Sequence, residues 1–124
     1  MSAERQLAEA YREWRHLAEI EGESITGRNW TLVAACQKAL QDLQGRISRL
    51  TPAARNEWPK SDRERAVRER ALNAVIRELI GLERRNQTLL NGLREAARLK
   101  LGQLAQAGRN LEQIQQSYGS AVRR

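Results

Sequence analysis

The second half of the chain contains no proline, and its apolar residues recur at intervals of three and four positions. Both prolines of the 124-residue chain, Pro52 and Pro59, lie in the short segment just before it. Proline interrupts a helix and disfavours helical geometry in the residue that precedes it. A long segment without proline and with a helical period therefore predicts one long helix, from about residue 62 to about residue 118.

Two shorter helices are predicted before the prolines. Residues 3–25 place their apolar and small side chains on one helical face. Gly27 weakens the pattern, and Asn29 is suited to cap a second helix over residues 29–50. The apolar residues of that second helix are spaced as in a coiled-coil seam. They are Val33, Cys36, Leu40, Leu43, Ile47 and Leu50.

Three such helices predict an all-α fold. Leu and Ala supply most of the apolar residues, aromatics make up 4% and Phe is absent, which favours helix over sheet. Because the chain turns around near Trp58, we expect an elongated antiparallel helical hairpin or a three-helix bundle with coiled-coil packing. The length predicts a single helical domain, residues 1–124. Asn86 falls on the apolar stripe of the long helix, where a buried amide can fix the register.

No group of residues in the sequence has the spacing of a catalytic, cofactor or metal site. The single histidine, His16, and the single cysteine, Cys36, do not form a familiar metal pair, and we expect Cys36 to be a buried apolar residue. The glycines are scattered singly and form no phosphate-binding loop. We expect the acids of residues 19–23 to form a solvated face. The sequence therefore predicts a protein that is not an enzyme, with no catalytic residue, cofactor or metal.

The net charge of +7 lies entirely after Thr51, where 15 basic residues accompany 8 acidic ones. A basic half can indicate nucleic acid, an anionic membrane surface or an acidic protein partner. In the predicted long helix, however, acidic residues alternate with the basic ones, and no aromatic residue stands among them for base stacking. We therefore expect a salt-bridged surface and no nucleic acid. A basic bundle that binds RNA or DNA is the alternative.

Neither a secretion signal nor a membrane span is recognisable. Residues 1–14 lack the apolar core of a signal peptide, and no uncharged apolar run approaches about 18 residues. The expectation is a cytoplasmic protein that does not insert into a membrane.

The apolar stripe of the predicted long helix is wider than one antiparallel contact can cover. We expect an amphipathic helix of another protein to cover the remainder. Two alternatives stay open. One is a structural coiled-coil protein that associates with its own copy as a homodimer, and the other is a monomer in which the first two segments cover the stripe.

Leucines and asparagines recur in a specific order in residues 79–93. The pattern consists of Leu79, Leu82, Asn86, Leu89, the Asn91-Gly92 pair and Leu93. A small polar break at residues 27–32 is followed by Lys38 and Leu40. These features resemble the FlgN-type flagellar export chaperones. The related FliT-type chaperones share the pattern of tryptophan and leucines in the second of these regions, residues 27–40.

The resemblance implies a chaperone that escorts hook-associated flagellar proteins, the hook-filament junction proteins, to the flagellar type III secretion apparatus. It implies that the carboxy-terminal helix binds an amphipathic segment of the client and prevents premature assembly. Members of that family are often acidic, whereas this chain has a pI near 10.7. The apolar anchors that we expect for the client are Leu90, Leu93, Leu101, Leu104, Leu111, Ile114 and Tyr118.

Overall fold

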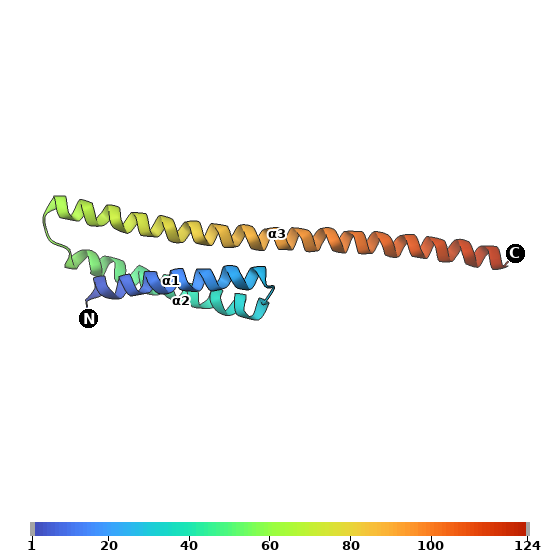
Figure 1. Cartoon of the computed structure of the whole chain (residues 1–124), viewed down its shortest axis with the longest axis horizontal. Helices are drawn as coiled ribbons and strands as arrows, with labels where there is room; N and C mark the ends of the chain where they lie inside the picture. The colour runs from blue at the N-terminus through green and yellow to red at the C-terminus, as the bar shows by residue number, and fades with distance from the viewer. Residues whose placement is uncertain (1, 124) are drawn as a thin grey trace. The chain divides into compact units, whose positions relative to one another are not determined.

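A computed structural model of the chain contains three α-helices and, within residues 2–123, no strand. Helix α1 spans Ala3–Thr26, α2 spans Trp30–Glu57 and α3 spans Asp62–Arg123 (Figure 1). The structure describes the backbone of residues 2–123 and the side chains of residues 2–117. The prediction of an all-α fold is confirmed. The chain divides into two units, Met1–Leu89 and Leu90–Arg124, and the single domain stays a prediction.

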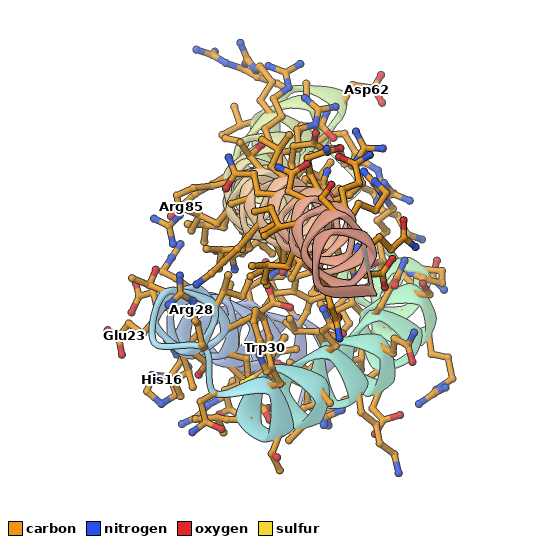
Figure 2. All side chains as sticks on the ribbon, turned by 90° about the vertical axis from the view of Figure 1, so that its right-hand side faces the viewer. His16, Glu23, Arg28, Trp30, Asp62 and Arg85 are labelled. Atoms are coloured by element: carbon orange, nitrogen blue, oxygen red, sulfur yellow. The ribbon has the colours of Figure 1, made fainter. Side chains whose placement is uncertain are left out.

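Helices α1 and α2 are joined by a tight turn at residues 27–29. Arg28 lies in the left-handed region, with φ of 56°, which is uncommon for a residue other than glycine. The side chain of Asn29 accepts a hydrogen bond from the backbone N–H of Leu32 at 3.2 Å and so caps α2, as predicted. Figure 2 shows Arg28 at this turn, next to Trp30 at the start of α2.

Helix α2 continues through Pro52 instead of ending near Leu50. Pro52 has no N–H group with which to donate the usual hydrogen bond of its turn. The proline itself is exposed, and Ala54 in the following turn lies in the core. Burial of Ala54, and of Trp58 at the end of the helix, helps to offset the missing hydrogen bond. The helix ends at Trp58, which is extended, with φ of −67° and ψ of 150°. This is the geometry that Pro59 imposes on the residue before it, as predicted.

Residues 2–89 form a three-helix bundle with one core. Its buried cluster consists of Leu7 and Tyr11 from α1, Ala54 from α2, Trp58 after it, and Leu72 and Leu79 from α3. Ion pairs border this core: the guanidinium of Arg15 donates two hydrogen bonds of 2.9 Å to the carboxylate of Glu78. Exposed pairs of this kind contribute at most about 1 kcal/mol each, so apolar burial dominates the stability.

A carboxylate from the end of α2 caps the start of α1. The two oxygens of Glu57 accept hydrogen bonds from the backbone N–H groups of Ala3, at 2.8 Å, and Glu4, at 3.1 Å. These bonds lower the pKa of Glu57, because they stabilise the ionised form. They also join the end of α2 to the start of α1, so the two helices pack antiparallel.

Asn86 is buried, at 2% exposure, as its place on the apolar stripe predicts. Its Nδ2 donates hydrogen bonds to the carbonyl of Ala18 at 2.7 Å and to Oε1 of Glu21 at 2.8 Å. Gly22 makes room for this amide, since a Cβ at position 22 would lie 2.7 Å from Oδ1 of Asn86. The amide therefore fixes the register of α3 against α1 within the bundle.

The expectation of a solvated acidic face at residues 19–23 is wrong for one of its three acids. Glu19 and Glu23 are exposed, but Glu21 is only 3% exposed. Asn86 offsets part of the desolvation of Glu21 through its hydrogen bond, which is why the carboxylate can be buried. Sequence spacing alone could not indicate this, because the amide comes from another helix.

Candidate partner-binding surface

Every described side chain from Arg94 to Ser117 of α3 is exposed. The large apolar residues among them have high exposed fractions, 66% for Leu101 and 59% for Leu104. Leu111 and Ile114 are equally open. Single exposed leucines are common on proteins, but several in a row along one element indicate an interaction surface.

These apolar side chains share one side of the helix. At about 100° per residue they fall within an arc of roughly 140°. We call this surface the leucine face, and it consists of Leu93, Leu101, Leu104, Leu111 and Ile114. Its ends are about 32 Å apart along the axis, at 1.5 Å per residue. Leu99, which is also exposed, projects about 120° from the direction of Leu93 and so lies outside the face.

The structure separates the predicted anchors into three groups. Leu90 is buried and Leu93 is half-buried, so Leu90 is not part of the leucine face. The next four anchors are exposed on that face: Leu101, Leu104, Leu111 and Ile114. The side chain of Tyr118 lies outside the described residues. The leucine face therefore includes Leu93 but not Leu90, and client contact by any of these residues stays a prediction.

The borders of the leucine face are polar. Residues 90–117 contain four basic side chains, Arg94, Arg98, Lys100 and Arg109, and two acidic ones, Glu95 and Glu112. Among the described residues, no helix is both long enough and apolar enough to cross a membrane.

Local interactions hold residues 94–117 in a helix. Arg98 pairs with Glu95 at 3.0 Å, and the amide of Gln106 donates to Oδ1 of Asn110 at 3.0 Å. Such pairs between residues three or four apart contribute about 0.2–0.5 kcal/mol each. Gly102 and Gly108 each weaken a helix by about 1 kcal/mol relative to Ala. A helix held this weakly gains stability from any partner that packs on its leucine face.

Reactive and metal-ligating side chains elsewhere in the described chain do not lie together in one site. His16 is exposed and projects outward from α1 (Figure 2). Cys36 is buried as predicted, and burial, with the charge of Glu21, raises the pKa of its thiol. A raised pKa leaves less of the reactive thiolate at neutral pH. No three potential ligands among the described His, Cys, Asp and Glu residues are placed to hold a metal ion.

One shallow depression lies where α2 meets α3. It is lined by Arg55, Trp58, Arg65, Ala66 and Glu69. The Arg55 guanidinium is already paired with the Glu69 carboxylate at 2.6 Å. The Arg65 guanidinium lies 5.8 Å from the centre of the Trp58 ring, within the range of a cation–π contact. Both arginines have partners within the fold, so the leucine face is the stronger candidate site.

Comparisons with protein-family models, with curated proteins and with solved structures find no match to this chain. A functional proposal therefore depends on the leucine face and on the resemblance carried by residues 79–93.

Proposed function

We propose that this protein is a cytoplasmic export chaperone of the FlgN type, which binds an amphipathic helix of a hook-filament junction protein. The observation that carries the proposal is the exposure of Leu101, Leu104, Leu111 and Ile114 in one row. An amphipathic helix with apolar residues three and four apart fits such a row. Binding covers the client's own apolar stripe and so keeps the client from assembling before export.

The size of the face suits a reversible complex. Full burial of one leucine side chain contributes about 1.5–3 kcal/mol, so four such residues contribute roughly 6–12 kcal/mol. Association itself opposes binding by about 4 kcal/mol or more. The difference corresponds to weak or moderate affinity, at about micromolar at best. An escort that must release its client needs a complex of this strength.

The proposal is tested with Leu104→Glu combined with Leu111→Glu. Both side chains are exposed, so the double variant should keep its helix content by circular dichroism. Two lost apolar contacts should weaken binding by about 100-fold or more. The measurement is isothermal titration with a synthetic carboxy-terminal segment of a hook-filament junction protein.

The control is Leu99→Glu, which places one negative charge on the same helix outside the face, about 140° around from Leu104 and about 120° from Leu111. We expect this variant to bind as the unmodified protein does. Equal affinity of the double variant and the unmodified protein would show that the leucine face is not the binding surface.

The net charge of +7 supports nucleic-acid binding as the alternative function. Several arginines are nevertheless already paired with glutamates in the described part of the chain. They are Arg15, Arg46, Arg55, Arg68 and Arg98. A gel-shift titration at two salt concentrations separates the two functions, because affinity for a phosphate backbone falls steeply with salt.

A further inference from the structure

Basic side chains lie at one end of the leucine face, within it and along one of its borders. At about 100° per residue, Lys100 projects only about 20° from the direction of Leu93, so it lies within the face itself. Arg94, at about 100°, follows the border that Leu101 forms at about 80°, and Arg98 projects about 60° beyond this border. All three basic residues are exposed. A partner seated on this end of the face therefore meets the positive charges of Lys100 and Arg94, with Arg98 beyond the border.

One acidic residue of the segment, Glu95, pairs with Arg98, and Arg94 and Lys100 have no acidic side chain beside them on the face. Glu95 projects about 160° from the direction of Leu93, on the far side of the helix. It pairs with Arg98, yet both side chains remain largely open to solvent. Glu112 lies on the border of the face but at its other end. The end formed by residues 93–101 is therefore positive where a partner would dock.

The rest of the face is nearly uncharged. Between residues 101 and 117 the only charged side chains are Arg109 and Glu112. The remaining polar positions are mostly amides: Gln103, Gln106, Asn110, Gln113, Gln115 and Gln116. The surface is thus asymmetric along its axis, basic at its start and neutral after it.

We infer that the client segment is an acidic amphipathic helix, with Asp and Glu beside its apolar stripe at the end that lies against residues 94–100. This inference rests on the proposed function. Opposite charges across an interface raise the association rate and select the partner, whereas like charges oppose binding. A second copy fits less well, since it offers only Glu112 opposite the basic end in an antiparallel pair. In a parallel pair it places the same three cations against each other.

The test uses three synthetic helical peptides with the same leucine stripe and with Glu, Gln or Lys at the flanking positions. Their binding to the full-length protein is measured by fluorescence anisotropy at about 50 mM and about 500 mM salt. We expect the Glu peptide to bind roughly tenfold tighter than the Gln peptide at low salt, and the Lys peptide to bind most weakly. The preference should shrink to about threefold or less at high salt, because salt screens exposed charges.

Two charge variants test which basic residues cause the preference for the Glu peptide over the Gln peptide. Arg94→Gln with Arg98→Gln and Lys100→Gln should remove most of the difference between the Glu and Gln peptides. The matched control, Arg63→Gln with Arg70→Gln and Arg77→Gln, removes the same net charge from exposed residues of the bundle. It should leave the preference in place. A preference that survives the first variant, or that the control also abolishes, overturns the inference.

The same experiment distinguishes a failure of the inference from a failure of the proposed function. Equal binding of all three peptides, lost in the Leu104→Glu and Leu111→Glu double variant, overturns acidic selectivity but supports helix binding. No binding of any peptide contradicts both. Sedimentation of the protein alone tests whether it associates with its own copy through the leucine face. A dimer that the double variant dissociates assigns the leucine face to a second copy and overturns the inference.

Discussion

Residues 2–89 and residues 94–117 contain the same kind of amphipathic helix, but only in the first region do the apolar stripes meet partners. Leu72 and Leu79 of α3 lie in the core of the bundle, whereas Leu101 and Leu104 of the same helix are exposed. Length explains the difference. Helix α3 has 62 residues, whereas α1 has 24 and α2 has 28. Since neither shorter helix has half the length of α3, neither can follow α3 along its whole apolar stripe.

The glycines show the same contrast. Gly22 sits against Asn86, so its lack of a side chain is required by packing. At Gly92, Gly102 and Gly108 an added Cβ meets no atom within 4 Å. At position 22 a neighbouring helix constrains the sequence, although Gly81 of the bundle is as open as the three glycines after it. In residues 94–117 the fold itself imposes little, so a conspicuous row of leucines there indicates a requirement outside the fold.

The largest effect that this comparison predicts is the difference between two leucine substitutions. Leu79→Ala leaves a cavity in the core and should lower the free energy of unfolding by about 2–5 kcal/mol. Leu104→Ala removes exposed atoms and should change it by about 0.5 kcal/mol or less. The measurement is urea denaturation followed by circular dichroism. The m-value, the slope of the free energy of unfolding against urea concentration, should be the same in all variants, because it reports the surface exposed on unfolding.

A large destabilisation by Leu104→Ala would break the comparison. It would mean that Leu104 is buried in solution, either in the fold or against a second copy. Repeating the denaturation at two protein concentrations separates these cases, because only the stability of an associated species depends on concentration.

Two glycine substitutions should have opposite signs. Gly22→Ala places a Cβ against Oδ1 of Asn86 and should destabilise the bundle by about 1–3 kcal/mol. Gly102→Ala meets no atom within 4 Å and should stabilise its helix by about 1 kcal/mol. The first is measured as a fall in Tm and the second as a gain in helical ellipticity. If Gly22→Ala were neutral, Asn86 would have to be free to move away.

Much of the fold could be predicted from local patterns. The two helix breaks follow from Asn29 and Pro59, and the buried places of Cys36 and Asn86 follow from the three-four spacing. These features depend on residues close in sequence. The predicted end of the second helix near Leu50 is wrong, because burial of Ala54 and Trp58 in the core supports the helix beyond Pro52.

The candidate surface could be predicted only in part. The leucine pattern indicates which side of α3 is apolar, but the same pattern runs through Leu79, Leu90 and Leu104. Only the structure shows that the first two are buried and the third is exposed. Burial of Glu21 escaped prediction for a related reason. The donor that satisfies it, Asn86, lies 65 positions away in the chain.

The smallest predicted effect concerns Glu83, a half-buried residue of the bundle. Burial, followed by the nearby charge of Glu21, raises the pKa of its carboxyl, and one of its oxygens has no hydrogen-bond partner. With the folded pKa above the unfolded one, the folded state holds the proton more tightly. Ionised Glu83 therefore destabilises the fold at neutral pH, and this penalty disappears as pH falls through the raised pKa towards the ordinary value.

Replacing Glu83 with Gln should therefore raise Tm at about pH 7 and leave it nearly unchanged near pH 4, where the carboxyl is mostly protonated in both states. Solvent still reaches Glu83, so the expected rise is only about 1–2 °C. Glu112→Gln, in the exposed segment, is the matched control and should shift Tm at neither pH. The measurement is thermal denaturation at both pH values. An equal gain for Glu83→Gln at pH 4 and pH 7 would assign the effect to packing, because a penalty that comes from charge must vanish with the charge.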